Sequence, residues 1–358
     1  MQNKLKLFVC LPSYNEAKNI SSITRKVDKA LRKLAKEYEC IIINADNRSA
    51  DGTNDIFNAT RTKCKKVSLL DENRGKGINI INFMKYFQEN NGDYAILIDT
   101  DLKSFKRKWI YKMLSNLRKD IDFVFPLYKR KRYEGNTTNH FVVPVLYALT
   151  GVKVRQPIGG DYAFNSKYVD LFLQQKISAE INMYGIDIFM VSLVFKYNLN
   201  YSQVKLGKKV HTLSYNKMEK IFGDVVKSFQ ISFKDYKKDY IVEEAALKYS
   251  SISKNKCNKF KNKIIEENKY RYDKLGIDIS QYEKIKKLWI EELVMYISEI
   301  NEVNNKRLIS MKNLFMCYAL AYWKRFAKSS SKDCENCIWN LAQEISKRRN
   351  EKNEISDK

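Results

Sequence analysis

The chain has 358 residues, of which 44% are hydrophobic, and this is enough to bury a core in one large domain or two. Its 66 lysines and arginines exceed its 41 aspartates and glutamates, which leaves a formal charge of +25 at pH 7. This composition excludes a disordered chain and favours anionic partners: nucleotide diphosphates, phosphorylated acceptors, nucleic acid or acidic membrane surfaces.

The predicted location of the protein is the cytoplasm. The N-terminal residues 1–5 lead at once into a predicted strand and do not fit a signal peptide. The longest apolar stretch, residues 141–154, is too short to span a bilayer. Seven cysteines, an odd number, indicate reduced thiols, and the single C-x-x-C of Cys334 and Cys337 is better explained by chance than by zinc. A homodimer and peripheral contact with an anionic membrane remain open.

The first half of the chain alternates short apolar runs with segments of helical spacing. Apolar runs predict strands, and 3.6-residue spacing predicts helices: strands at 5–11, 40–44, 67–70, 94–98 and 123–126, and helices at 20–34, 78–87 and 109–117. Strands that alternate with helices at this pitch indicate crossover connections. The predicted fold class is therefore α/β, with a mostly parallel, Rossmann-like sheet flanked by helices.

The second part of the chain has a different texture. From about Lys217, prolines disappear, lysines and tyrosines become frequent, and helical spacing dominates. We therefore expect two regions: a nucleotide-binding and catalytic domain at residues 1–215, and a basic, mainly helical C-terminal region at residues 216–358. The end of the chain after Lys347 is expected to be disordered.

An acidic pair closes the most informative strand. Asp99 and Asp101 follow the apolar run at residues 94–98 directly. A buried strand that ends in two carboxylates delivers them to the edge where open α/β sheets bind ligands. Carboxylate and phosphate oxygens together suit Mg²⁺ or Mn²⁺. The pair therefore indicates a metal site that also takes a diphosphate, although a loop start or a helix cap explains the three residues equally simply.

Four successive predicted strands each end in a polar, turn-rich loop. These loops lie at residues 12–16, 44–53, 73–77 and 99–101. Ordinary turn chemistry explains any one of them. It explains all four in this order poorly, because the carboxyl ends of parallel strands meet at one edge of the sheet, where nucleotides bind.

With these loops, the chain resembles the nucleotide-sugar glycosyltransferases of the GT-A fold, in the style of family two. The resemblance covers roughly residues 5–215 and rests on Pro-Ser-Tyr-Asn-Glu, Asp-Asn-Arg-Ser-Ala-Asp-Gly-Thr, Asn-Arg-Gly-Lys-Gly and Asp-Thr-Asp. It implies a nucleoside-diphosphate sugar as donor and Mg²⁺ or Mn²⁺ as cofactor. The implied donor-binding residues are Pro12, Tyr14, Glu16, Asp46, Lys76, Asp99 and Thr100, and the implied metal ligand in the triplet is Asp101.

A second set of motifs resembles the mannosylglycerate synthase and glucosyl-3-phosphoglycerate synthase group, which are retaining transferases. The motifs lie at residues 134–139, 155–161, 184–187 and 210–211. The resemblance implies that His211 completes the metal site and that Asp187 faces the transferred sugar. It also implies that the loop containing Gly135, Asn136 and Thr137 meets the acceptor.

The acceptor loop departs from the group's pattern. Asn136 and Thr137 stand where an arginine is common, so Arg130 or Arg132 would have to contact an acidic acceptor. The basic run at residues 129–132 fits phosphate attraction and mere solubility equally well. If the reaction inverted the sugar, Asp161 or Asp187 would have to act as general base. His140, beside an apolar stretch, is expected to be structural.

We predict a metal-dependent enzyme that moves a hexose from a nucleoside-diphosphate sugar to a small hydroxy-acid acceptor such as glycerate or phosphoglycerate, with retention. One alternative acceptor is a polyprenyl phosphate or cell-surface glycan at a membrane face, which the basic C-terminal helices would contact. A nucleotidyltransferase is disfavoured because its glycine-rich first loop is missing. A nucleic-acid-binding protein is disfavoured because the lysines are spread along the chain without a recognisable binding motif.

Overall fold

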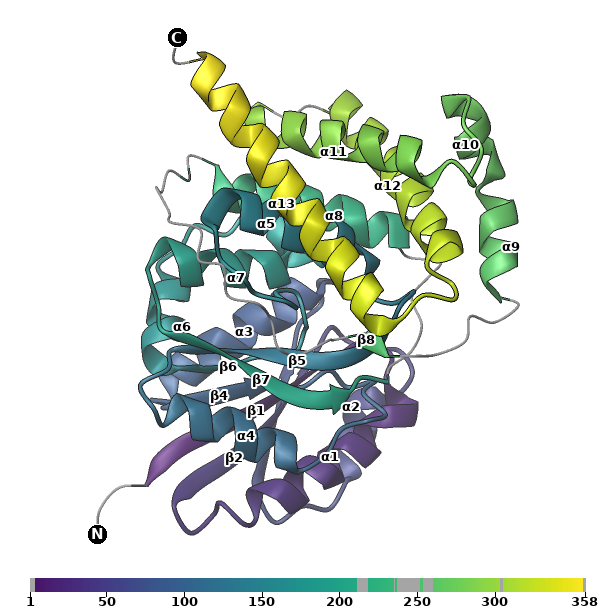
Figure 1. Ribbon diagram of the computed structural model, residues 1–358. Coiled ribbons are helices and arrows are strands. Elements are labelled where there is room, and N and C mark those ends of the chain that lie inside the picture. Colours follow the sequence, from purple (N-terminus) through teal and green to yellow (C-terminus); the bar gives the residue numbers. More distant parts are fainter. Residues whose placement is uncertain are drawn as a thin grey trace. The chain divides into compact units, whose positions relative to one another are not determined.

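The computed structural model describes residues 4–210, 218–234, 236, 252–253, 260–302 and 305–356 (Figure 1). The chain forms two compact units: Met1–Tyr128 with Ile158–Ser214, and Lys129–Pro157 with Tyr215–Lys358. The domain boundary predicted from the sequence, between residues 215 and 216, lies one residue from the limit between Ser214 and Tyr215. Residues 129–157, assigned to the first domain on sequence pattern, belong instead to the second unit, because their apolar helices pack against its C-terminal helices.

The described part of the first unit contains a path of seven strands in the order β3-β2-β1-β4-β6-β5-β7. β1 pairs in parallel with β2 and β4, and β2 pairs in parallel with β3, whereas β6 runs antiparallel between β4 and β5. The predicted mostly parallel sheet is therefore confirmed. The strands are β1 (Leu5–Ser13), β2 (Tyr38–Asp46), β3 (Lys65–Leu70), β4 (Tyr94–Leu97), β5 (Phe123–Lys131), β6 (Ala163–Asn165) and β7 (Tyr201–Lys208).

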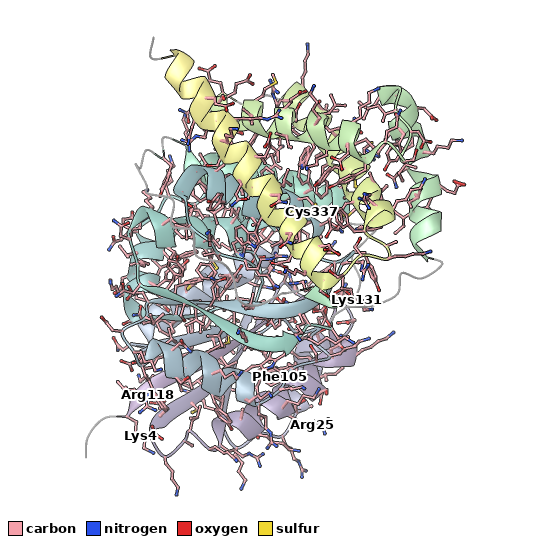
Figure 2. The ribbon with its side chains drawn as sticks, in the orientation of Figure 1. Lys4, Arg25, Phe105, Arg118, Lys131 and Cys337 are labelled. Carbon is pink, nitrogen blue, oxygen red and sulfur yellow. The ribbon has the colours of Figure 1, made fainter. Side chains whose placement is uncertain are left out.

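Helices cover both faces of this sheet, so the central strands are apolar on both sides. One face carries α1 (Ala17–Leu31), α2 (Thr53–Ala59) and α4 (Lys108–Leu117), whose apolar side chains share one cluster with β1, β2 and β4. Phe105, labelled in Figure 2, belongs to this cluster and meets Trp109 edge to face at 5.8 Å. The other face carries α3 (Lys76–Glu89), α6 (Ser166–Leu173) and α7 (Ile186–Lys196), which contact one another (Figure 1).

The second unit is mainly helical in its described part. Its elements are a π-helical turn η1 (Thr138–Val142), α5 (Val143–Thr150), α8 (Met218–Phe233), the short strand β8 (Ile252–Ser253), α9 (Phe260–Glu267), α10 (Lys269–Leu275), α11 (Tyr282–Ser298), α12 (Asn305–Arg325) and α13 (Ser331–Ser356). The expected disorder after Lys347 is wrong for residues 348–356, which continue α13. None of the described helices is both long and apolar enough to cross a bilayer.

Aromatic side chains fill the interior of the second unit. Phe222 and Phe315 stack at 4.0 Å between ring centroids. His140 is fully buried and lies 4.5 Å from the ring of Tyr322, and burial, followed by the charge of Arg155, lowers the pKa of His140 to about 3. This neutral imidazole is the structural residue that the sequence predicts. On α13, Cys337 (Figure 2) is half-buried.

Asp122 ties together three strand ends in the first unit. This buried carboxylate accepts hydrogen bonds from Asn165 Nδ2 at 2.9 Å, Lys167 Nζ at 2.9 Å and the backbone N–H of Asn200 at 3.0 Å. Burial alone would raise the pKa of Asp122, but these hydrogen bonds outweigh it and lower the pKa. The stabilisation is therefore complete above the ordinary aspartate pKa of about 4 and is lost as the pH falls through the lowered pKa.

We expect Asp122→Asn to lower the free energy of unfolding at pH 7 by about 1–3 kcal/mol, because an amide cannot accept all three hydrogen bonds as the carboxylate does. The difference from the wild type should shrink towards pH 3. Denaturant unfolding at both pH values measures this, with the exposed Asp120 changed to Asn as the control. A difference that does not depend on pH would contradict the role given to the charge.

Candidate active site

The loops after β1, β2, β3 and β4 are joined by hydrogen bonds at one edge of the sheet. Thr100 Oγ1, after β4, donates to the carbonyl of Pro12 at 2.6 Å. The backbone N–H of Asn47, after β2, donates to the carbonyl of Ser13 at 3.4 Å, and its side-chain amide donates to the carbonyl of Asn73 at 2.8 Å. The four loops that the sequence predicts to converge thus form one connected site.

One half of this site has features that fit a nucleoside. Asp46 is fully buried at the end of β2, and its Oδ1 accepts from the N–H and hydroxyl of Ser49 at 3.0 and 2.6 Å. Its Oδ2 is a buried acceptor with no hydrogen-bond partner among the described residues. Tyr14 is 39% exposed, and the guanidinium of Arg74 lies 5.2 Å from its ring centroid. This half of the site therefore offers a hydrogen-bond acceptor, Asp46 Oδ2, and an exposed aromatic face, the ring of Tyr14.

The other half is a charged cluster of three carboxylates and two lysines: Asp99, Asp161, Asp187, Lys76 and Lys209. Lys76 Nζ lies 3.2 Å from an oxygen of Asp187 and 3.4 Å from Oδ1 of Asp99. Lys209 Nζ lies 2.9 Å from Oδ2 of Asp99 and 2.7 Å from Oδ2 of Asp161. Asp99 therefore meets a different lysine on each of its two oxygens.

Two carboxylates of the cluster differ in their surroundings. Asp161 is fully buried: its Oδ1 accepts from the backbone N–H of Asp99 at 2.8 Å, and its Oδ2 accepts from the hydroxyl of Tyr128 at 2.7 Å. Asp187 lies in the first turn of α7, and its side chain is 13% exposed. Burial raises the pKa of Asp187, and the positive charge of Lys76 opposes this rise. Of these two predicted catalytic residues, Asp187 is the more open to a ligand.

Tight packing places Lys76 next to Asp187. A Cβ atom on Gly77 would lie only 2.1 Å from the carbonyl oxygen of Ile181, and one on Gly75 would lie 2.1 Å from that of Asn182. The loop around Lys76 therefore packs directly on the segment that precedes α7. Burial alone would lower the pKa of Lys76, but the charges of Asp187, Asp99 and Asp161 outweigh it and raise the pKa. Lys76 is a permanent cation at the site.

Negative charge also gathers around Asp101. Burial raises the pKa of Glu16, and the charges of Asp101, Asp51 and Asp99 add to this rise, against a hydrogen bond from Asn19. Within the described residues, no three His, Cys, Asp or Glu side chains form a group that could hold a metal ion. The other predicted ligand, His211, lies outside the described residues.

The last described residue before His211 is hydrogen bonded to the acidic loop. Val210 accepts from the backbone N–H of Lys103 at 2.9 Å, and its own N–H donates to Ser104 Oγ at 2.9 Å. Val210 is therefore held next to the residues two and three positions beyond Asp101.

The predicted acceptor-binding residues belong to the second unit. Asn136 is buried, and its side chain accepts from Trp323 Nε1 at 2.9 Å and donates to the carbonyl of Tyr133 at 3.1 Å. Thr137, also buried, directly precedes η1, and Gly135 has a left-handed φ of +70°. Within the second unit, these contacts of Asn136 hold the loop to α12.

The two arginines considered for the acceptor also differ. Arg132 is buried and donates to the carbonyls of Phe326 and Ala327, just beyond the C-terminal end of α12. Such contacts suit the negative end of a helix, so Arg132 has a structural function. Arg130 places its Nε 3.5 Å from Oε1 of Gln156.

Lys209 and Tyr128 complete the charged cluster and were not predicted from the sequence. Lys209 follows β7 directly, and no spacing or neighbouring motif distinguishes it from the other lysines of this basic chain. The resemblance marks His211, two residues later, and this is the nearest signal in the sequence.

The carboxyl edge of an open, mostly parallel sheet is where α/β folds bind nucleotides, and the polar loops and the charged cluster lie at this edge. Comparison of the sequence with protein families agrees: residues 8–169 carry a glycosyl transferase family 2 domain. Over these residues the chain is therefore similar to the glycosyltransferases of this family.

Two curated relatives are similar over part of their length. A dolichol-phosphate mannosyltransferase of Pyrococcus furiosus is 22% identical over 204 residues, which are 53% of this chain and 53% of the relative. An undecaprenyl-phosphate 4-deoxy-4-formamido-L-arabinose transferase of Pseudomonas paraeruginosa is 28% identical over 99 residues, 27% of this chain and 28% of the relative. The matches thus span about half or less of these relatives.

The fold is similar to solved structures of glucosyl-3-phosphoglycerate synthase from Mycobacterium tuberculosis. The complex with Mn²⁺, UDP and glucosyl-3-phosphoglycerate is 22% identical, with a TM-score of 0.53, over 64% of this chain and 80% of that one. The complex with Mn²⁺, UDP-glucose and phosphoglyceric acid has 23% identity and the same TM-score, over 64% and 79% of the two chains. These similarities confirm the GT-A fold that the motifs predict.

Proposed function

We propose that the protein is a metal-dependent glycosyltransferase that moves a hexose from a nucleoside-diphosphate sugar to a small hydroxy-acid acceptor, such as glycerate or phosphoglycerate, with retention. The observation that carries this proposal is the charged cluster at the carboxyl edge of a glycosyl transferase family 2 domain. The likeness of fold to a synthase solved with UDP-glucose, Mn²⁺ and phosphoglyceric acid supports the same substrate classes.

In this proposal the nucleoside lies between the loops after β1 and β2. Oδ2 of Asp46, which has no hydrogen-bond partner among the described residues, accepts from an N–H of the base, and the exposed ring of Tyr14 lies against the plane of the base. Pro12 and Glu16 border the same loop, and Thr100 holds it by its hydrogen bond to Pro12.

The residues near Asp101 fit a divalent cation. Carboxylate oxygens and diphosphate oxygens form the hard donor set that Mg²⁺ and Mn²⁺ prefer, and the negative charge shared by Glu16, Asp99 and Asp101 favours a cation there. Asp101 and His211 are the proposed protein ligands. When bound, the cation supplies positive charge to the departing diphosphate.

Lys76 and Asp187 would perform the steps next to the sugar. The side chain of Lys76 is 20% exposed and its ammonium lies 3.2–3.4 Å from its carboxylate partners, so the ammonium can turn towards the developing negative charge of the diphosphate. This movement uncovers the charge of Asp187, which then faces the oxocarbenium-like carbon and stabilises it. Asp161, which is buried and hydrogen bonded on both oxygens, supports the site instead of deprotonating an acceptor.

A second candidate acceptor is a polyprenyl phosphate. Both curated relatives named above are polyprenyl-phosphate sugar transferases by name, and a formal charge of +25 favours an anionic surface. For either acceptor, the proposed acceptor-binding residues are Arg130, Gly135, Asn136 and Thr137.

The test is a thermal-shift screen of UDP, GDP and ADP sugars with Mn²⁺ and with Mg²⁺. At about 100 times its Kd, the correct donor should stabilise the protein by about 2.7 kcal/mol. Tyr14→Ala should reduce this shift, whereas Tyr197→Ala should not, because Tyr197 is a similarly exposed tyrosine that directly follows α7. Absence of a shift with every donor would refute the proposal.

With the donor known, the acceptor is found by comparing 3-phosphoglycerate, glycerate and a polyprenyl phosphate in vesicles. NMR of the product gives the anomer and therefore the stereochemical outcome. Transfer to the soluble acids supports the first candidate. Transfer only to the lipid, with co-sedimentation on anionic vesicles at low salt, supports the second.

A further inference from the structure

Lys209 is a buried lysine in a place that general stability does not explain. Its side chain is only 3% exposed, and its Nζ donates to Asp99 Oδ2, Asp161 Oδ2 and the carbonyl of Gly159 at 2.9, 2.7 and 2.8 Å. These three acceptors equal the number of N–H groups in an ammonium. The attraction within a buried ion pair roughly balances the free energy needed to remove both charges from water, so the pair adds little net stability. Its function is therefore sought in the geometry that it imposes on its partners.

The geometry of Lys209 centres on Asp99. The Asp99 side chain is 23% exposed and is the member of this group that faces solvent at the site. Asp161 holds its backbone through the N–H at 2.8 Å, and Lys209 holds its carboxylate through Oδ2. Tyr128 supports the assembly, with its hydroxyl on Asp161 and its ring centroid 5.1 Å from the ammonium.

We propose that Lys209 is the positioning residue for Asp99: it fixes the carboxylate in the orientation that binds the hydroxyls of the donor sugar. It does not bind the donor itself, because its three donors already point to protein oxygens at 2.7–2.9 Å and it is almost fully covered. Lys76, more exposed and with longer contacts, is the lysine that meets the ligand. This inference rests on the proposed function, because it takes the ligand of Asp99 to be the sugar nucleotide.

The experiment is a comparison of variants in the Asp161→Asn background. Lys209→Met alone would leave the buried Asp161 unpaired and could unfold the protein, whereas the amide removes that charge. We expect Asp161→Asn/Lys209→Met to have a kcat about 100-fold below that of Asp161→Asn, with a Tm within a few degrees of it. Affinity for the nucleoside diphosphate should stay within about threefold, and affinity for the sugar nucleotide should fall at least tenfold. Lys208→Met, an exposed neighbour, is the charge control.

A double-mutant cycle then asks whether Lys209 acts through Asp99. With Asp99 already replaced by alanine, adding Lys209→Met to Asp161→Asn should change kcat by less than about threefold, because the carboxylate to be positioned is gone. A full 100-fold loss of kcat in the Asp99→Ala background would overturn the proposal. The proposal would also fail if Asp161→Asn/Lys209→Met lost no more activity than the control Lys208→Met. If the wild type binds no sugar nucleotide, the proposed function itself fails, which is a distinct result.

Discussion

Asp101→Ala is expected to lower metal-dependent turnover by about a thousandfold or more while the protein remains folded. The carboxylate is one of the two proposed protein ligands and lies in the turn after β4. A group that stabilises charge on a leaving diphosphate lowers the reaction barrier by about several kcal/mol. Asp101 is partly exposed at a strand end, so its removal leaves the apolar core of the sheet unchanged. Initial rates across a range of Mn²⁺ concentrations measure the loss, and circular dichroism checks the fold.

The matched control is Asp55→Ala, an exposed aspartate in the first turn of α2, which should keep wild-type rates. His211→Ala tests the other proposed ligand separately. Undiminished metal-dependent turnover in either ligand variant would remove that residue from the proposed metal site. Loss of the melting transition in Asp101→Ala would instead assign the carboxylate a structural function.

Gly160→Ala is expected to reduce kcat about 100-fold. A Cβ atom at this position would lie 2.6 Å from Oδ2 of Asp99 and 3.3 Å from Oδ1. The same Oδ2 accepts the hydrogen bond from Lys209, so the methyl group must push the carboxylate away from its lysine. A displacement of about 1 Å in a site residue can cost about 100-fold in rate.

Gly207→Ala separates this clash from backbone strain. Gly160 and Gly207 have nearly the same left-handed φ, +87° and +88°, but a Cβ on Gly207 would meet no atom within 4 Å. Both variants should therefore lose a similar amount of stability, about 1–2 kcal/mol, and only Gly160→Ala should lose activity. Thermal unfolding and kcat for both variants give the comparison. Equal activities would show that the position of Asp99 tolerates the methyl group.

The local pattern of the sequence was enough to predict the central sheet. The apolar runs that became β1, β2, β3, β4 and the start of β5 are short and bounded by turn residues, and strands buried on both faces have this signature. The strand β6 could not be predicted, because its three residues are too few to show a period. Its antiparallel pairing depends on neighbours distant in the sequence.

Within the site, the sequence alone determined the four loops that follow these strands, because parallel strands bring their carboxyl ends to one edge. It also marked Asp99, Lys76 and Asp187, which the structure brings together. Only the tertiary structure decided that Asp161 is buried and hydrogen bonded on both oxygens, and that Lys209 joins it to Asp99. Among so many lysines, burial and opposing carboxylates distinguish this one. Both depend on contacts between segments far apart in the chain, which spacing along the sequence does not record.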